Sequence, residues 1–561
     1  MDQESPIEEL NRFRQYESTL DNLEIPLRPE NRRRTDKKYV VTFITLVVIL
    51  IPFMIYTLNH ADFKHLAGSD DCGNFCGYKN EKYDEWNCTG QDFTEKKYLA
   101  TYQKIRNDYL PTSVFHHKIC VEKCPPGNIP GFEEVSCEDN LNKSDAAEYE
   151  KIINGVEEAW WVIVLSVIIT CSLCFGMILL FRYAVDYTVW GLLIGSIGVL
   201  MIFAGRLWMI YFYYPSTSDE AHQYLIYAGG LSIFVLFLIV LVSCMIERVK
   251  LIIELFKEAS KAIFEIPGLI HLPVLTFAAV ALTMIVLVVL TLYSFTASVL
   301  MEIRPNQLDY ELNGAILFTI LYNIFVCTWF MQFMVSAQYM IIAGAISAWF
   351  FTRNKNYLDS PLWTSFVNFI KFHLGTVLIG SLILTIVKII RMILRALSSN
   401  NRTRWLVECC CGELIAFLKL FSNNAYIQTA MHGQSFFKSG KRAVMLLVSN
   451  AENVVAINSI GSFVLVIAQF VIMVVGGVIA LWIASASGNP HQAYNVGAIC
   501  CILTICIVII FFNIFEATID SIFMCFCEDT LINDGMARPF FMSKGLHQFI
   551  QNCKGVIPAK K

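Results

Sequence analysis

Two carboxylates stand at the end of the last long apolar stretch of the chain. The stretch YNVGAICCILTICIVIIFF is followed directly by NIFEATIDSIF, which covers residues 513–523. Glu516 and Asp520 are four residues apart, so on a helix their side chains share one face. Acids at this place could form an inner gate for cations, or a proton-carrying acid that alternates with a substrate. The alternative is a solvated helix end, where carboxylates reach water or a neighbouring lysine.

The composition indicates which kind of element must hold these acids. Of the 561 residues, 55% are hydrophobic and only 16% are charged, whereas about a quarter of an average soluble protein is charged. The apolar residues also fall in runs longer than about 18 residues, which is the signature of membrane spans. The net charge is −4, and no basic stripe or RNA-binding motif is present, which argues against a nucleic-acid partner.

The N-terminal segment predicts a cytoplasmic start. Residues 1–38 are polar, whereas a cleavable signal peptide would place its apolar core much earlier. Basic residues next to a span stay in the cytoplasm. Here the basic cluster consists of Arg32, Arg33, Arg34, Lys37 and Lys38. The first span follows at residues 39–58.

Residues 59–158 form a large polar loop, which the cytoplasmic start places outside the cell or in a lumen. An even number of cysteines in an exported loop predicts up to three disulfides, in a pairing that the sequence leaves open. The six are Cys72, Cys76, Cys88, Cys120, Cys124 and Cys137. The glycosylation sequons at Asn87 and Asn142 agree with export. Acidic residues outnumber basic ones in this loop. The excess indicates either a solvated surface or a region that enriches cations near the entrance of a transport path.

The rest of the chain is mostly apolar spans. With the first span, nine segments are predicted. The other eight lie near Ala159–Arg182, Val189–Tyr213, Tyr224–Met245, Pro273–Leu300, Ala315–Phe351, Phe366–Lys388, Gly461–Ile483 and Val496–Cys525. The segment ERVKLIIELFKEASKAIF carries charges at helical spacing and predicts an amphipathic helix on the cytoplasmic surface. The following IPGLIHLP predicts a break before the next span.

Nine crossings would put the two chain ends on opposite sides of the membrane, although the tail SKGLHQFIQNCKGVIPAKK is basic and looks cytoplasmic. Arg353–Lys355 and Arg391–Arg404, on either side of the seventh span, are basic too. We favour a tenth span at Trp405–Phe421, although it contains Glu408, Glu413 and Lys419 at a cost in free energy. The alternative is that Phe366–Lys388 enters the membrane and leaves on the same side.

The predicted fold class is therefore all-α: a polytopic transmembrane bundle of about ten spans, with a disulfide-rich extracellular loop after the first span. The predicted organisation runs from a cytoplasmic N-terminal tail to a cytoplasmic C-terminal tail. Its parts are the tail 1–38, the first span 39–58, the glycosylated loop 59–158, the transmembrane bundle with cytoplasmic amphipathic segments 159–525 and the tail 526–561.

Several stretches, in order along nearly the whole chain after residue 39, resemble the choline transporter-like family of solute carriers. They are DCGNFCG (Asp71–Gly77), CVEKCP (Cys120–Pro125), IPGLIHLPVLTF, AGAISAWFF, FHLGTVLIGSLILTIVKIIR, NNAYIQTAMHGQSFFKSGKRAVMLLVSN, DSIFMCFCEDTLINDG and RPFFMSKGL. The chain departs from the family in its second external loop, near Glu302–Leu312, which is shorter than in many relatives. Asp520 lies in the family-like TIDSIF, whereas Glu516 matches no family residue securely.

The resemblance implies a carrier of choline, and in some members of ethanolamine, in the plasma membrane or an organellar membrane. The quaternary ammonium of choline cannot donate an ordinary hydrogen bond, so its recognition needs aromatic faces, each worth about 0.5–2 kcal/mol. Tyr322, Phe325 and Trp329 follow one helical face near the middle of the sixth span. They are a candidate cation cage, with Asp520 and Glu516 as candidate acids. The alternative is that the three aromatic residues only pack.

Other residue patterns predict neither an enzyme nor a metal site. No Walker loop, HExxH or nucleophile elbow is present, so we expect no catalytic residues, cofactor or metal. His373 is a candidate for hydrogen bonding or a proton role. The cysteines Cys409–Cys411 lack the spacing of a tetrahedral metal site and indicate packing or palmitoylation.

The expected function is a membrane carrier for choline, or ethanolamine, working by alternating access with proton coupling as an option. Its partners would be the small cation and the lipid bilayer, most simply at the plasma membrane. The alternatives are a channel, a lipid-handling membrane protein, or an adhesion or scaffold protein acting through the cysteine-rich loop.

Overall fold

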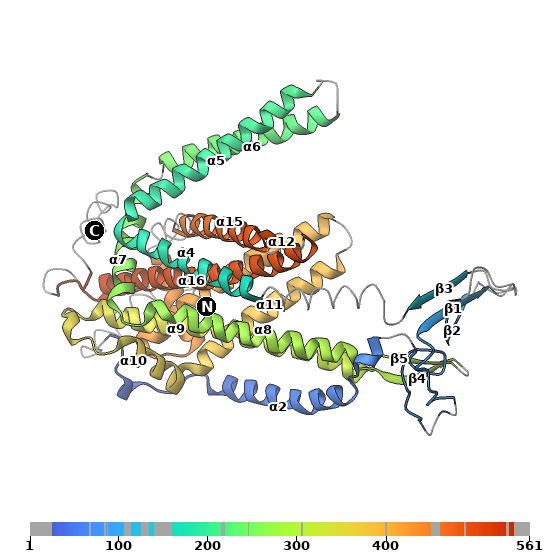
Figure 1. Cartoon of the computed structure of the whole chain (residues 1–561). Helices are drawn as coiled ribbons and strands as arrows, with labels where there is room; N and C mark the ends of the chain where they lie inside the picture. Colours follow the sequence, from blue (N-terminus) through green and yellow to red (C-terminus); the bar gives the residue numbers. More distant parts are fainter. Residues whose placement is uncertain are drawn as a thin grey trace, which may run out of the picture.

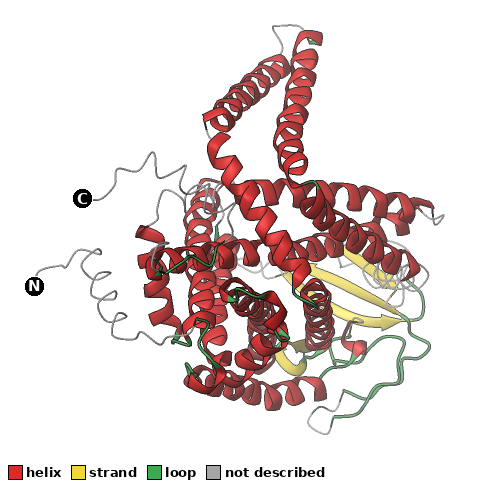
Figure 2. Ribbon diagram, turned by 90° about the vertical axis from the view of Figure 1, so that its left-hand side faces the viewer, coloured by secondary structure: helices red, strands yellow, loops and turns green. Residues whose placement is uncertain are grey.

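A computed structural model of the chain describes residues 25–66, 69–83, 86, 88–105, 114–124, 134–139, 160–214, 219–244, 246–304, 307–398, 401–449, 461–486, 490–533 and 538–542. Within these residues the protein is an all-α bundle of long helices with two small sheets at one end (Figure 1). Seen along the helices, the bundle is a cluster from which one helical hairpin, α5–α6, projects (Figure 2).

Nine helices of the described part are long and apolar enough to cross a membrane. They are α2 (Lys37–Asn59), α4 (Trp160–Tyr183), α5 (Val185–Tyr213), α6 (Asp219–Cys244), α8 (Leu272–Thr296), α9 (Gly314–Phe351), α10 (Pro361–Asn368) continued through the π-helical turn Phe369–His373 into α11 (Leu374–Leu397), α15 (Ser462–Ala486) and α16 (Pro490–Ile532). They confirm the nine predicted segments and a multi-pass membrane protein. The last helix extends to Ile532, beyond the predicted Cys525.

The disputed tenth segment belongs to α12 (Asn401–His432), which is too polar to count among the nine. This helix runs antiparallel to α11. Arg391 of α11 pairs with Glu408 near the start of α12, and Gly380 of α11 lies against Tyr426 near its end. The end of α11 and the start of α12 lie toward the end of the molecule that carries the strands (Figure 1). This arrangement supports a tenth crossing over a re-entrant seventh segment.

Two of the three charges that make α12 a poor span by composition, Glu408 and Lys419, have partners on neighbouring helices. Glu408 contacts Arg391, and Arg395 Nη1 lies 3.3 Å from Glu408 Oε1. Lys419 Nζ donates to Glu516 Oε1 of α16 at 2.6 Å. A single charge at the centre of a span costs about 2.5–3.5 kcal/mol on insertion scales. Pairing offsets part of this cost, and hydropathy alone does not count it.

The predicted amphipathic helix is confirmed as α7 (Ile246–Glu265). It is tied to the end of α9 by Trp349, whose indole N–H donates to Glu265 Oε2 at 2.8 Å. Gly268 follows with a φ of 82° and begins the short 3₁₀ turn Leu269–His271, which confirms the predicted break before α8. A second amphipathic helix, α13 (Phe436–Ser449), follows α12.

The end of the bundle that the sequence predicts to be external is built from two antiparallel sheets. One has the order β2-β1-β3 and contains β1 (Tyr98–Ile105), β2 (Val114–Val121) and β3 (Glu134–Asp139). The other is the hairpin of β4 (Val299–Arg304) and β5 (Gln307–Glu311), which forms the short second external loop. Lys118 Nζ donates to Asp309 Oδ2 at 2.7 Å, so the cysteine-rich loop is attached to this hairpin.

The loop contains the disulfide Cys76–Cys120, and Cys124 is also disulfide-bonded. Cys72 and Cys88 are free thiols that lie against each other. The pKa of the Cys72 thiol is raised to about 12, mainly by burial and secondly by this contact. A third disulfide therefore stays a prediction. Asn87, Asn142 and the side chain of Cys137 lie outside what the structure describes.

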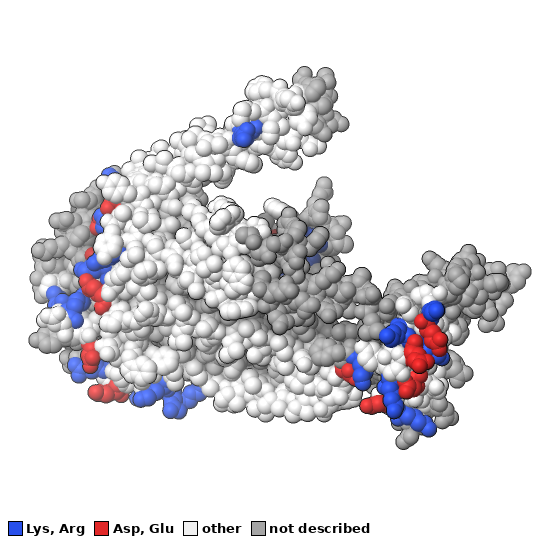
Figure 3. Space-filling model, viewed as in Figure 1, with Lys and Arg blue, Asp and Glu red and all other residues white. Residues whose placement is uncertain are grey.

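Charged side chains gather at the two ends of the molecule, with a mostly uncharged belt between them (Figure 3). This is the distribution expected of a bundle that spans a bilayer. Within the bundle, α16 is the central helix, because it contacts α4, α7, α8, α9, α12, α13 and α15. Its apolar segment is also the most buried of the nine spans, at 56%. The two acids singled out in the sequence therefore lie on the helix that most other helices touch.

The tenth crossing predicts which side of the membrane the α11–α12 turn faces. In a variant without exposed native cysteines, Ser399→Cys should react with an impermeant maleimide on intact cells. The matched control, Asn354→Cys between α9 and α10, should react only after permeabilisation. Labelling of Ser399→Cys that also requires permeabilisation would reject the tenth crossing.

Candidate functional site

A cluster of polar side chains lies where α9, α12 and α16 meet, inside the apolar part of the bundle. Each helix contributes members from its second half, counted from the external end. They are Tyr339 on α9, Lys419 and Asn423 on α12, and Glu516 and Asp520 on α16. Polar and charged groups at this depth are costly in a bilayer, which makes the cluster a candidate for function.

Asp520 is held by a tyrosine rather than by a cation. The Tyr339 hydroxyl donates to Asp520 Oδ2 at 2.6 Å. The side chain of Asn423 also interacts with this hydroxyl. The ring of Tyr339 lies 6.5 Å from the ring of Tyr426, and both tyrosines are buried. An acid and two aromatic rings are therefore close together.

Glu516 has a cation as its partner. Lys419 Nζ donates to Glu516 Oε1 at 2.6 Å, one helical turn to the external side of Asp520. The charges that act on Asp520 are those of Glu516 and Lys419. When all three groups are ionised, the lysine balances one acid and a charge of −1 remains. Such a site favours a cation.

The external side of this cluster carries further polar groups on the facing helices. Lys388 Nζ of α11 donates to Gln332 Oε1 of α9 at 2.5 Å. Gln338 Nε2 donates to the carbonyl of Ile510, at 3.4 Å. The side-chain amide nitrogen of Asn513 is buried without a hydrogen-bond partner among the described residues. A polar ligand near Asp520 would meet donors and acceptors as well as rings.

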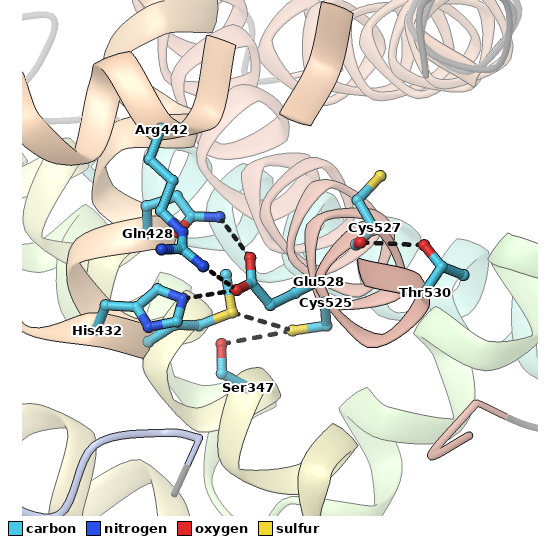
Figure 4. A network of polar contacts seen from close by, with 9 residues as sticks. Ser347, Gln428, His432, Arg442, Cys525, Cys527, Glu528 and Thr530 are labelled. Carbon is cyan, nitrogen blue, oxygen red and sulfur yellow. Dashed lines mark hydrogen bonds and ion pairs between the residues drawn. The ribbon is translucent and has the colours of Figure 1, made fainter. Parts of the chain in front are cut away.

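A second polar cluster lies closer to the cytoplasmic end of α16 (Figure 4). Glu528 is fully buried and accepts a hydrogen bond from Arg442 of α13. His432 Nε2 and Gln428 Nε2 of α12 lie 3.1 and 3.5 Å from its carboxylate oxygens. Removing one partner of a buried ion pair typically costs about 3–5 kcal/mol. This cluster therefore acts as a clamp that joins three helices.

The predicted aromatic stripe on α9 lies against α2 and α11. Trp329 is fully buried, and its indole N–H donates to the carbonyl of Leu378 at 3.2 Å and to Ser381 Oγ at 3.1 Å. The Tyr322 hydroxyl donates to the carbonyl of Leu46 on α2 at 2.9 Å. Phe325 lies 6.1 Å from Trp329, ring to ring. These contacts are those of helix packing, and a role in cation binding stays a prediction.

Among the described residues, no hydrogen bond, ion pair or ring contact joins the stripe to the two acids. His373 takes part in hydrogen bonds with Arg32 and Thr35, in agreement with its predicted hydrogen-bonding role. Cys409 and Cys410 lie exposed on the surface of α12. Within the described ranges, no group of three metal-ligating side chains is present.

Sequence reasoning found the two acids but missed Tyr339 and the role of Lys419. A signal for Tyr339 was present, because SAQY places Ser336, Gln338 and Tyr339 together inside an otherwise apolar helix. Lys419 was counted only as a cost of the tenth span. Its partner is 97 residues away in the chain, and no local pattern reveals such a pair.

The match to a family and the similarity to individual proteins agree with each other. The sequence model of a family described as "Plasma-membrane choline transporter" matches residues 230–531, which include every member of the α9–α12–α16 cluster. Choline transporter-like protein 1 of Torpedo marmorata is 27% identical, with 94% of each chain aligned. The protein of the same name from Mus musculus is 26% identical over 94% of this chain and 93% of the relative. Choline transporter-like protein 3 of Homo sapiens is 26% identical over 93% of this chain and 91% of the relative.

The Lys419–Glu516 pair predicts a coupled effect on stability. Lys419→Met should lower the free energy of unfolding by about 1–3 kcal/mol, because it leaves one partly exposed carboxylate unpaired inside the bundle. The double variant Lys419→Met/Glu516→Gln should recover most of the loss. Glu413→Gln, an exposed acid on the same helix, is the control. Thermal unfolding of the purified proteins measures these effects. A double variant whose loss equals the sum of the losses of Lys419→Met and Glu516→Gln would contradict the pair.

Proposed function

The chain belongs to the choline transporter family, and on that premise we propose that it carries choline across the membrane and binds its cationic head beside Asp520 and Tyr339. The observation that carries this proposal is the contact of Asp520 with the Tyr339 hydroxyl at 2.6 Å, inside the bundle, where no described residue forms an ion pair with Asp520.

The chemistry of the cluster suits a quaternary ammonium. The trimethylammonium group is apolar on its surface and positively charged, so it is bound by aromatic faces with a carboxylate close by. Tyr339 and Tyr426 supply faces, and Asp520 supplies the charge. The hydroxyl of choline can exchange hydrogen bonds with Asn423 or Asn513. Ethanolamine would lose most of the aromatic contribution, so we expect it to be the weaker substrate.

Lys419 has a specific part in this proposal. By pairing with Glu516 it keeps its own ammonium away from Asp520. If Glu516 is neutralised, Lys419 is free to turn toward Asp520, one helical turn away, and to take the place of the substrate cation. Glu516 thus acts indirectly, by positioning Lys419.

A carrier mechanism is supported by the different exposure of the two sides of the cluster. On the external side, the side chains of Lys419 and Glu516 are 51% and 32% exposed. Charged groups that are exposed at membrane depth are expected to face water. On the cytoplasmic side, Tyr426 and Phe436 are fully buried and their rings lie 6.0 Å apart. We infer a state that is accessible from outside and closed inside, as alternating access requires.

Proton coupling is a further part of the proposal. A carboxylate that balances a substrate cation can hold a proton when the substrate has left, so Asp520 can alternate between the two. Uptake would then fall as external pH decreases, because protons compete with choline for the same group.

These roles predict the transport phenotype of three variants. Asp520→Asn keeps the size of the side chain and removes its charge, so it should reach the surface and lose most choline uptake. Glu516→Gln should raise the KM for choline by releasing Lys419. Lys419→Met/Glu516→Gln should restore much of the lost affinity, because no lysine then competes. Radiolabelled choline uptake, normalised to surface protein and measured from pH 6 to 8, tests all three.

The control is Glu413→Gln, which should transport as the unmodified protein does. Trans-stimulation by internal choline should accompany uptake by a carrier and be missing from a channel. Normal uptake by Asp520→Asn at every pH would contradict the proposed site.

A further inference from the structure

A short segment before the first span lies across the cytoplasmic end of the bundle. We call this segment, Pro26–Asp36, the N-terminal strap. Its backbone is joined to α12 by the hydrogen bond from Leu27 N to the carbonyl of Met431, at 2.8 Å, and to the π-helical turn by that from Thr35 N to the carbonyl of Phe372, at 2.8 Å. The sequence had indicated only that this segment is basic and cytoplasmic.

Arg32 is the main side-chain attachment of the strap. Unlike the exposed Arg33 and Arg34, it is only 8% exposed. Its Nη2 donates to the carbonyl of Ala430 at 2.6 Å, in the last turn of α12, where the helix dipole favours a cation. Its Nε donates to the carbonyl of Leu27 at 2.9 Å. Burial lowers the pKa of Arg32 to about 10, so it stays charged at neutral pH.

A chain of hydrogen bonds continues from Arg32 through the π-helical turn. Arg32 Nη1 lies 3.1 Å from His373 Nε2 and can only donate, so we assign the ring proton to Nδ1. His373 Nδ1 lies 3.0 Å from Thr35 Oγ1, which is 2.7 Å from Thr376 Oγ1. Thr376 in turn donates to Asp36 Oδ2 at 2.9 Å. The C-terminal half of the strap is thus bonded to the π-helical turn and to the start of α11.

The packing leaves no room between the strap and α11. A Cβ added at Gly375 would lie 2.2 Å from the carbonyl oxygen of Asp36. Asp36 Oδ2 also accepts a hydrogen bond from the backbone N–H of Phe436, at the start of α13, at 2.9 Å. The strap therefore connects α11, α12 and α13 at the inner end.

Under the strap lies a cavity of about 150 Å³. Its lining includes Arg32 and Leu27 from the strap, Met340 from α9 and Ala430 from α12. Met340 is the residue next to Tyr339, and Ala430 lies one turn beyond Tyr426 on the same helix. The cavity and the strap thus occupy the cytoplasmic side of the acid and the two rings.

We propose that the N-terminal strap is the inner gate of the transport path, and that Arg32 holds it closed. The proposal rests on the proposed function, because it assigns the exit of the same site. In the closed state the guanidinium of Arg32 stands in the way of a cation that leaves toward the cytoplasm, and repels it. Release of the substrate then requires that Arg32 leaves the end of α12 and that the strap moves away from Gly375.

The first test measures access to the covered cavity and needs no transport. In a variant without exposed native cysteines, Met340→Cys is placed under the strap and labelled with an impermeant maleimide in inside-out vesicles. Arg32→Ala should increase the labelling rate several-fold, because the strap loses its main attachment. Gly375→Ala should do the same by a different route, because its methyl group collides with the strap. Arg33→Ala, the exposed neighbour, is the matched control and should label slowly, as Met340→Cys alone does.

The second test asks whether movement of the strap is needed for transport. Cysteines at Thr35 and Thr376 should form a disulfide on oxidation, because the two hydroxyls are in contact. The cross-linked protein should still bind external choline but lose uptake, and a reductant should restore uptake. Each single cysteine variant is a control.

The two proposals fail in different ways. If Met340→Cys is labelled at the same rate with and without Arg32→Ala or Gly375→Ala, the strap does not cover the cavity, whatever the substrate is. Unchanged uptake by the fully cross-linked protein would overturn it as a gate. If these variants speed the labelling of Met340→Cys but the protein neither binds nor carries choline, the strap covers the cavity and the proposed function is rejected.

Discussion

The ion pair between Lys419 and Glu516 is the interaction on which the centre of this molecule depends. It joins α12 to α16 by a contact of 2.6 Å between residues that are costly to leave unpaired in a membrane. Without it, α12 would carry an unpaired cation through the bundle, and α16 would carry two unpaired acids. With it, a polar helix becomes an acceptable tenth span, and Asp520 is left as the acid without a lysine.

Three acids of the described part of the bundle are paired with a cation on a neighbouring helix. Glu408 contacts Arg391, Glu516 contacts Lys419, and Glu528 contacts Arg442. Each of these pairs connects two helices and neutralises an acid. Asp520 differs from these three, because its hydrogen bond comes from the neutral Tyr339. An acid kept among aromatic rings without a cation is suited to receive one from a substrate.

Much of the fold could be predicted from the sequence, because membrane spans are marked by local composition. The nine apolar segments, the amphipathic helix before α8 and the exported cysteine-rich loop all follow from residues that are close together in the chain. The tenth span was predicted from the charge of the chain ends rather than from its own composition. Its polar residues find partners on α11 and α16, which a reading of one segment at a time cannot include.

The candidate site was predicted only in part, and for the same reason. Glu516 and Asp520 are conspicuous because acids are rare in apolar runs. Their partners are common residue types that become significant only through contacts distant in the chain. The aromatic stripe of Tyr322, Phe325 and Trp329 has the right spacing, yet in the structure it faces neighbouring helices. Arg32 cannot be distinguished in the sequence from Arg33 and Arg34, because only the folded bundle buries one of the three.

The central claim is that Asp520 recognises the positive charge of the substrate. It is tested most directly by comparing the binding of choline with that of its uncharged analogue, in which a quaternary carbon replaces the nitrogen. The two molecules have nearly the same shape, so the ratio of their dissociation constants reports the contribution of charge. We expect the unmodified protein to prefer choline strongly and Asp520→Asn to lose most of that preference. An equal preference in both proteins would contradict the account.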